Sequence, residues 1–186
     1  MSQFFIIDTP LYDLKVIERK PIGDSRGHLA RIFCADQLGD AGWKKPIAQI
    51  NQTMTKSRGT VRGLHFQGPP YAEMKLISCL QGEIWDVAVD LRKDSPTFLQ
   101  WHAERLSSEN YRALLIPEGF AHGFQTLTNS CELLYLHSAP YKQVAEGGIR
   151  PNDPRLEIDW PLDFYEISAR DSEHPLLNDV FKGIEI

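Results

Sequence analysis

Most of this chain consists of short apolar runs separated by turn residues, and this spacing limits the folds it can adopt. Strand-like runs cover residues 48–54, 59–67, 74–80, 84–91, 113–116, 123–127 and 132–136. Turn residues follow at Gln81-Gly82, Lys93 to Pro96 and Pro117 to Gly119. Many short strands without long helical patterns between them predict an all-β sandwich or barrel. Short peripheral helices are expected at residues 36–41 and after Asp163, and the turn-rich tail from residue 151 is expected to wrap the barrel.

Size and composition predict one soluble domain that spans residues 1–186. The net charge of −5 argues against general nucleic-acid binding, but it allows an anionic small ligand. No apolar run approaches the roughly 20 residues of a membrane helix, and the first residues lack the basic segment of a signal peptide. Three widely separated cysteines suggest reduced thiols in a cytoplasmic protein.

A histidine lies inside the strand-like run at residues 59–67. Strand alternation places His65 on one face with Gly63 and Gln67, and Leu64 and Phe66 on the other. A face with small and polar groups, opposite one with bulky apolar groups, suggests a sheet that lines a wet cavity. A hydrogen-bonded core histidine would give the same pattern, so this run alone does not establish a catalytic site.

The turn from Pro117 through Gly119 to His122 resembles the second motif of the cupins, which are small jelly-roll β-barrels with a ligand pocket in the mouth. Many cupins bind a metal through a His-x-His pair in the first motif. Here that motif has only His65, and two histidines are too few for a typical catalytic metal site. We therefore expect no metal and no other cofactor, with a metal-dependent cupin as an alternative.

Taken together, the motifs resemble the dTDP-4-dehydrorhamnose 3,5-epimerases of nucleotide-sugar metabolism. They run in family order over nearly the whole chain. The motifs lie at residues 24–27, 62–67, 75–76, 86–92, 95–98, 106–110, 116–124, 134–135, 152–154 and 160–161. The resemblance implies a cupin-type jelly-roll β-barrel that inverts C3, C5 or both in a nucleotide-linked 4-keto-6-deoxyhexose, for deoxysugar and O-antigen-type polysaccharide synthesis.

The resemblance also implies catalytic roles. The C4 ketone acidifies the neighbouring C–H bonds, so inversion needs a base on one face of the sugar and an acid on the other. It further needs positive charge or donors at the ketone oxygen. By resemblance, His65 is the base, Asp171 holds it, and Tyr135 is the acid. Lys75 and His122 lie near the ketone oxygen.

The binding residues that the resemblance implies are less complete. They are Arg26, Arg62, Gln49 and Asn51 for the diphosphate and nucleoside, with Tyr141, Glu146 and Arg170 also near the nucleotide. The family exchanges N-terminal strands between protomers, which implies a homodimer. Phe4 to Ile7 form an apolar start that such a partner would cover.

Two positions depart from the family pattern. Leu29 stands where an aromatic residue is usual, and Arg31 stands where the family has a glutamate that touches the partner's nucleotide base. Arg31 offers donors in place of acceptors, which predicts a base other than thymine, with a CDP-sugar as the first alternative. A single-centre epimerase, a ketoisomerase and a non-catalytic sugar-binding protein also remain open.

Overall fold

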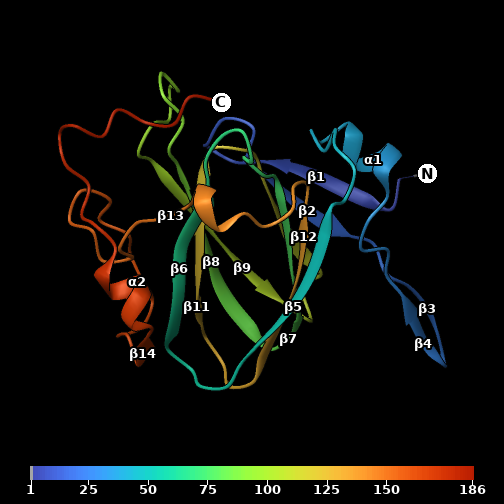
Figure 1. The fold of residues 1–186 in the computed structure, drawn as a ribbon. Coiled ribbons are helices and arrows are strands. Elements are labelled where there is room, and N and C mark those ends of the chain that lie inside the picture. The colour runs from blue at the N-terminus through green and yellow to red at the C-terminus, as the bar shows by residue number, and fades with distance from the viewer. Residues whose placement is uncertain (1) are drawn as a thin grey trace.

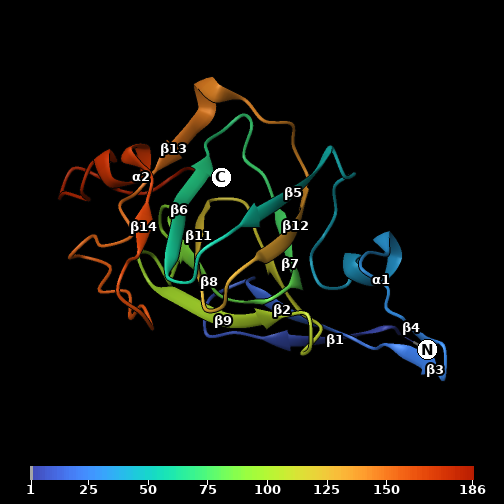
Figure 2. The same ribbon diagram turned by 90° about the horizontal axis from the view of Figure 1, so that it is seen from below.

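The computed structural model describes residues 2–186 and contains two facing β-sheets (Figures 1 and 2). Four central strands of the first sheet lie in the order β10-β7-β12-β5, and four of the second in the order β6-β11-β8-β9. These eight strands are β5 (Gln49–Thr55), β6 (Thr60–Gln67), β7 (Lys75–Gln81), β8 (Glu83–Asp90), β9 (Trp101–Ser107), β10 (Arg112–Ile116), β11 (Phe120–Thr126) and β12 (Cys131–His137).

The connections among these eight strands give a jelly roll. All pairings within the two four-stranded layers are antiparallel, and the chain crosses between the layers at most of its turns. Apolar residues that alternate along the strands form the core between the sheets. Ile77, Leu114, Phe124 and Leu133 are almost fully buried there. The prediction of an all-β jelly-roll barrel is therefore confirmed.

Two further strands extend the first sheet. The strands β1 (Phe4–Asp8) and β2 (Lys15–Arg19) form a hairpin, and β2 pairs with β10. The chain then forms a small hairpin of β3 (Ile22–Asp24) and β4 (Gly27–Leu29), which projects away from the barrel in both views (Figures 1 and 2). The helix α1 (Ala35–Gly39) follows it. The strand β1 is left at the edge of its sheet.

The C-terminal part of the chain covers the outer face of the second sheet. After a short 3₁₀ turn at Gln143–Ala145, the strand β13 (Glu146–Gly148) pairs with the last residues of β6. The strand β14 (Glu166–Ile167) pairs with the first residues of β6. Apolar side chains of the tail, including Ile149, Leu156 and Phe181, pack on Leu64 and Val89. This packing brings the helix α2 (Ala169–Glu173) beside β6.

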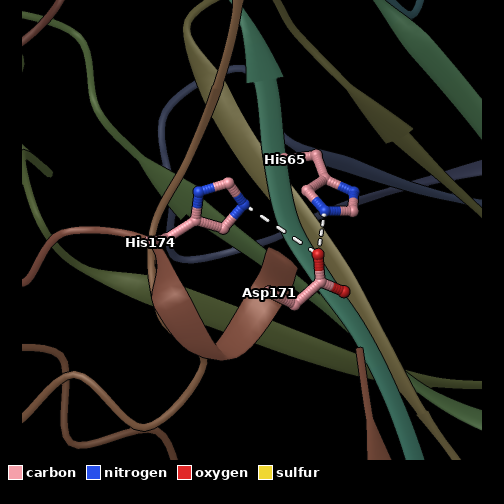
Figure 3. Close-up of side chains that lie close together, drawn as sticks. All are labelled: His65, Asp171 and His174. Atoms are coloured by element: carbon pink, nitrogen blue, oxygen red, sulfur yellow. Dashed lines mark hydrogen bonds and ion pairs between the residues drawn. The ribbon is translucent and has the colours of Figure 1, made fainter. Parts of the chain in front are cut away.

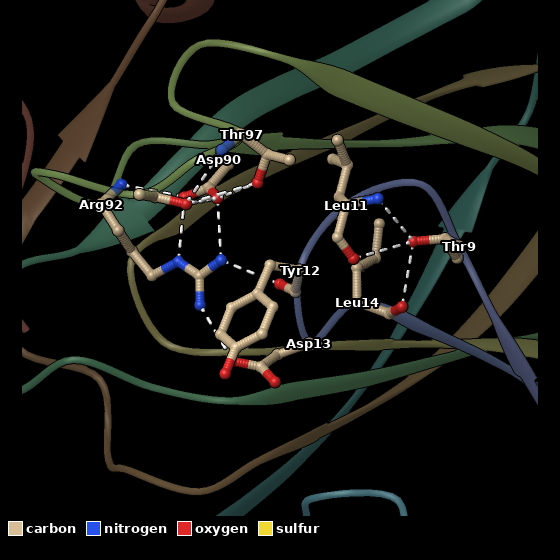
Figure 4. A network of polar contacts seen from close by, with 9 residues as sticks. Thr9, Leu11, Tyr12, Asp13, Leu14, Asp90, Arg92 and Thr97 are labelled. Atoms are coloured by element: carbon tan, nitrogen blue, oxygen red, sulfur yellow. Dashed lines mark hydrogen bonds and ion pairs between the residues drawn. The ribbon is translucent and has the colours of Figure 1, made fainter.

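A polar network anchors the loop after β1 to the end of β8 (Figure 4). Arg92 donates to both carboxylate oxygens of buried Asp90, at 2.9 and 2.8 Å, and to the carbonyl oxygen of Tyr12 at 2.8 Å. Burial opposes ionisation of Asp90, but the hydrogen bonds from Arg92, Ser95 and Thr97 hold its pKa below the ordinary value. The network therefore joins the N-terminal hairpin to the barrel through Arg92, whose guanidinium group is hydrogen-bonded to Asp90 and Tyr12.

The other predictions about the fold hold with shifted boundaries. The two expected helices are α1 and α2, and the tail wraps the barrel as expected. Leu64 faces the outer cluster and His65 the cavity, as alternation predicts, but Phe66 also reaches the edge of the cavity. Within residues 2–186, no helix is long and apolar enough to cross a membrane.

Candidate active site

A cavity of about 760 Å³ lies between the two sheets, lined by residues of β5, β6, β7, β11 and β12. Figure 2 shows β6 and β11 on one side of this space and β5, β12 and β7 on the other. Eleven of the thirteen predicted site residues line it, namely Gln49, Asn51, Arg62, His65, Lys75, His122, Tyr135, Tyr141, Glu146, Arg170 and Asp171. Residues that are far apart in the sequence thus come together in one pocket.

A histidine–aspartate pair occupies one wall of the cavity (Figure 3). His65 Nε2 lies 2.7 Å from Asp171 Oδ1, and the backbone N–H of Gly63 donates to Asp171 Oδ2 at 3.0 Å. Burial opposes ionisation of Asp171, but these two hydrogen bonds lower its pKa to about 2. Asp171 is therefore a carboxylate at neutral pH and can only accept, so His65 Nε2 carries a proton in this hydrogen bond.

The local backbone lets β6 lie close to β11 and fixes the start of α2. Gly63 has a φ of +118°, and a side chain there would place its Cβ 2.6 Å from the Cα of Gly123 on the neighbouring strand. At the start of α2, Ser168 caps the helix by accepting from the N–H of Asp171 at 3.1 Å. The cap fixes the backbone at Asp171, and the hydrogen bond from the Gly63 N–H holds its carboxylate against the strand that carries His65.

His174, at the end of α2, is a third member of this group that the sequence analysis missed. Its Nε2 lies 3.9 Å from Asp171 Oδ1, which is too far for a hydrogen bond, and its ring meets His65 edge-on at 5.9 Å (Figure 3). Burial, followed by the charge of His65, lowers the pKa of His174. The residue is therefore neutral at physiological pH.

His65, Asp171 and His174 have the donor types of a metal site, with ligand atoms within 4.8 Å of one another. Two atoms bound to one tetrahedral zinc at about 2.0–2.1 Å stand roughly 3.3 Å apart. The distance of 2.7 Å between His65 Nε2 and Asp171 Oδ1 is instead that of a hydrogen bond. The geometry thus fits a hydrogen-bonded pair better than a set of metal ligands, and metal independence stays a prediction.

The opposite wall carries Tyr135, on β12. Its ring lies 5.9 Å from the ring of His122, and His122 Nε2 lies 2.7 Å from Oδ1 of fully buried Asp86. Burial, with a smaller contribution from the charge of Asp86, raises the pKa of Tyr135 well above its ordinary value. Burial also raises the pKa of Asp86, against the attraction of His122. Tyr135 therefore keeps its proton at neutral pH.

Lys75 begins β7 on the same wall as Tyr135. Its Nζ donates across the cavity to the backbone carbonyl oxygen of His65 at 3.2 Å and lies 3.3 Å from Glu73 Oε1. The other carboxylate oxygen of Glu73 lies 2.9 Å from His137 Nδ1. The ammonium group is thus held inside the pocket by one carbonyl and one carboxylate.

Four predicted binding residues form a connected rim. Gln49 Oε1 accepts from the N–H of Tyr141 at 3.1 Å, and the Tyr141 hydroxyl donates to Glu146 Oε2 at 3.0 Å. Arg170 Nη1 lies 3.2 Å from the same Glu146 oxygen, and its Nη2 lies 2.9 Å from His65 Nε2. The rim therefore reaches the histidine–aspartate pair, but the contact of Arg170 with His65 is not a hydrogen bond while Nε2 donates to Asp171, because both groups are then donors.

Arg26 and Arg31 do not line the cavity of their own chain. Arg26, between β3 and β4, pairs with Asp24 at 2.6 Å, and both side chains are largely exposed. Arg31 follows the same projecting hairpin and is exposed. A single chain thus assembles eleven of the predicted residues and leaves these two outside.

The sequence analysis missed Glu73, Asp86, His137 and His174, which all contact predicted site residues. Strand alternation relates only one of them to a predicted residue, because His137 is two residues from Tyr135 on β12, whereas Glu73 lies before β7 begins. No comparable pattern marks His174, which reaches the site only through the fold of the tail.

Comparison with known proteins agrees with this geometry. The family model described as dTDP-4-dehydrorhamnose 3,5-epimerase matches residues 8–179. A Salmonella typhimurium dTDP-4-dehydrorhamnose 3,5-epimerase is 43% identical over 175 residues, which is 93% of this chain and 95% of that protein. A Streptomyces niveus dTDP-4-dehydrorhamnose 3-epimerase is 38% identical over 83% of this chain and 74% of its own length.

A crystal structure gives the same answer for the fold. The dTDP-4-dehydrorhamnose 3,5-epimerase of Bacillus anthracis, solved with TDP and PPi bound, superposes with a TM-score of 0.90 at 41% identity. The match covers 94% of this chain and 99% of the other. The family match, the relatives and the shared jelly roll agree over nearly the full length, and so the chain belongs to the dTDP-4-dehydrorhamnose 3,5-epimerase family of isomerases.

Proposed function

We propose that this epimerase uses His65 as its base and Tyr135 as its acid on a nucleotide-linked 4-keto-6-deoxyhexose. The observation that carries the proposal is their placement, because His65 lies on β6 of one sheet and Tyr135 on β12 of the other, with the cavity between them. Inversion of a carbon requires removal of a proton from one face and its return to the other. Two groups on facing walls meet this requirement.

The sequence of proton transfers follows from the hydrogen bonds. Nδ1 of His65 takes the proton from the carbon next to the C4 ketone, and the electron pair of that C–H bond delocalises into an enolate. Asp171 stabilises the imidazolium that forms. The charge that develops on the ketone oxygen is stabilised by the ammonium of Lys75, with His122 beside it. Tyr135 then protonates the carbon from the other face.

The proposal places the nucleotide diphosphate at the rim and beside Arg62. The guanidinium groups of Arg62 and Arg170 suit its oxygens because each offers a planar pair of donors. Gln49, Asn51 and Tyr141, which line the same cavity, would then hold the nucleoside. The relatives are named for dTDP-sugars, so a dTDP-linked substrate is the first to test. Because relatives include a 3,5-epimerase and a 3-epimerase, the number of inverted carbons must be measured.

A homodimer with exchanged N-terminal segments is part of the proposal. The edge strand β1 exposes Phe5 at 55%, and the projecting hairpin exposes Ile22 at 60% and Leu29 at 65%. Apolar groups on an open strand edge favour pairing with another chain. A second copy would cover these residues and would bring Arg26 and Arg31 to a neighbouring cavity.

The deciding experiment is incubation with dTDP-, CDP- and GDP-linked 4-keto-6-deoxyglucose in deuterated water, followed by NMR. Deuterium at C3, C5 or both, together with the inverted product, supports the proposal and identifies the carbons and the preferred nucleotide. Absence of exchange with all three sugars, from protein that binds a nucleotide, would refute it and favour a non-catalytic sugar-binding protein.

A further inference from the structure

Three ionisable side chains lie together in the cavity wall, although a buried charge normally requires a partner. The exposed fractions of the Glu73, Lys75 and His137 side chains are 9%, 8% and 10%. An ammonium group so far from solvent loses its charge unless an anion or strong acceptors lie close to it. Lys75 must keep that charge to stabilise an enolate, so its surroundings bear directly on catalysis.

The hydrogen bonds show which atoms of this group donate and which accept. Burial opposes ionisation of Glu73, but the hydrogen bond from His137 and the charge of Lys75 hold its pKa below the ordinary value. The Glu73 carboxylate can therefore only accept, and His137 Nδ1, 2.9 Å away, must donate to it. His137 Nδ1 thus carries a proton. The amide nitrogen of Asn51 lies 3.4 Å from the other ring nitrogen, Nε2.

The same arrangement directs the lysine. Of the three N–H donors of the Lys75 ammonium, one is directed to Glu73 and one to the carbonyl oxygen of His65, so one remains for the cavity. Glu73 stands 3.3 Å from Nζ, longer than the 2.7–2.9 Å of a tight charge-assisted hydrogen bond. By holding the other oxygen of Glu73, His137 keeps the carboxylate beside the ammonium without letting the two close to a tight ion pair.

We propose that Glu73 and His137 are positioning residues, which keep Lys75 charged and direct its third N–H toward the ketone oxygen of the substrate. Neither residue donates to the sugar or takes a proton from it. Asn51 completes the chain by fixing the tautomer of His137, and the ring of Tyr135 supports it through parallel stacking at 6.0 Å. This inference rests on the proposed role of Lys75 at the ketone oxygen.

A double-mutant cycle tests whether Glu73 acts through Lys75. In Glu73→Gln, the amide oxygen can still accept from His137, but the amide nitrogen faces the ammonium of Lys75. We expect kcat to fall roughly 10- to 100-fold at nearly constant KM, less than the roughly 10²- to 10³-fold loss expected from removing a donor of the oxyanion itself. In a Lys75→Met background, the same change should alter kcat by less than about twofold. A matched control is Glu132→Gln, since Glu132 is on β12 outside the cavity lining.

Equal losses in both backgrounds would overturn the inference, because Glu73 would then act independently of Lys75. A second measurement needs no substrate and no variant. The ¹⁵N shifts of the wild-type imidazoles should show His137 protonated at Nδ1, and an Nε2–H tautomer would overturn the inference. If no 4-keto sugar exchanges deuterium with the wild-type enzyme, the proposed function fails. The tautomer of His137 would still test the arrangement of hydrogen bonds among Glu73, His137 and Asn51.

Discussion

The substitution Asp171→Asn replaces one carboxylate oxygen with an NH₂ group. It therefore separates the two hydrogen bonds that the aspartate accepts. Its two carboxylate oxygens accept from different donors, His65 Nε2 at 2.7 Å and the backbone N–H of Gly63 at 3.0 Å. An asparagine has only one acceptor oxygen. The backbone N–H cannot become an acceptor, so the amide oxygen should turn to Gly63 and the amide nitrogen to His65. Nε2 of His65 must then accept, and the ring proton moves to Nδ1.

Both stability and rate should respond. The fall in the pKa of Asp171 from 3.8 to about 2 corresponds to about 2.5 kcal/mol of stability at pH 7, at about 1.4 kcal/mol per pH unit. Because the pKa is lowered by folding, this stabilisation is present above about pH 4 and is lost as the pH falls toward 2. The rate effect should be larger, since the analogous Asp→Asn change in a serine protease costs about 10⁴ in kcat through the wrong histidine tautomer.

The assay measures the exchange of substrate protons with deuterated water, beside urea unfolding at pH 7 and at pH 3. We expect Asp171→Asn to lose exchange by a factor on the order of 10³ to 10⁴ while nucleotide binding is kept. The unfolding free energy should fall by about 2–3 kcal/mol at pH 7 and by less at pH 3. Ser172→Ala, next to the aspartate and outside the cavity lining, is the control. Exchange above a tenth of the wild-type rate, with an Nδ1–H tautomer at His65, would refute this reasoning.

Replacement of His65 by Asn should leave folding and nucleotide binding intact and remove C–H exchange, and exchange near the wild-type rate would exclude His65 as the base. Tyr135→Phe should slow formation of the epimer more than it slows exchange at the first carbon, whereas equal losses would argue against a separate acid. Light scattering at micromolar concentration should give the mass of a dimer, and a monomer would contradict strand exchange. Competition binding should show CDP preferred to dTDP because Leu29 stacks less and Arg31 offers donors, a prediction that fails if dTDP binds at least tenfold more tightly.

The fold could be predicted from local patterns because the barrel strands are short, apolar and regularly interrupted. Seven of the eight central strands correspond to runs identified in the sequence, and β9 is the exception. In β9, charged residues at Glu104 and Arg105 interrupt the apolar alternation, since the strand lies at the edge of its sheet and leaves most of its side chains partly exposed. Alternation detects a strand only where one face is consistently buried.

The site could be predicted only in part, because its members meet through the tertiary fold. The family resemblance identified His65, Asp171 and Tyr135, but nothing in the sequence joins β6 to α2, which are more than a hundred residues apart. Glu73 and His137 escaped notice because polar residues near strand ends are usually exposed, and only the fold shows that both are buried beside Lys75. Arg26 and Arg31 lie outside the cavity of their own chain, and under the proposed strand exchange they would reach a cavity only in a second copy.

The charge of the cavity shows why a protein with a net charge of −5 can bind an anionic diphosphate. Charges on the surface beyond about 10 Å are screened at physiological salt, so the nearest groups decide. Within residues 2–186, Arg62 lines the cavity without an ion pair, whereas Arg170 is shared between Glu146 and the histidine–aspartate pair. A diphosphate should therefore bind Arg62 first and then draw Arg170 from Glu146. That movement would also remove a guanidinium group from His65 Nε2. His65 would then pair with Asp171 alone when the substrate is bound.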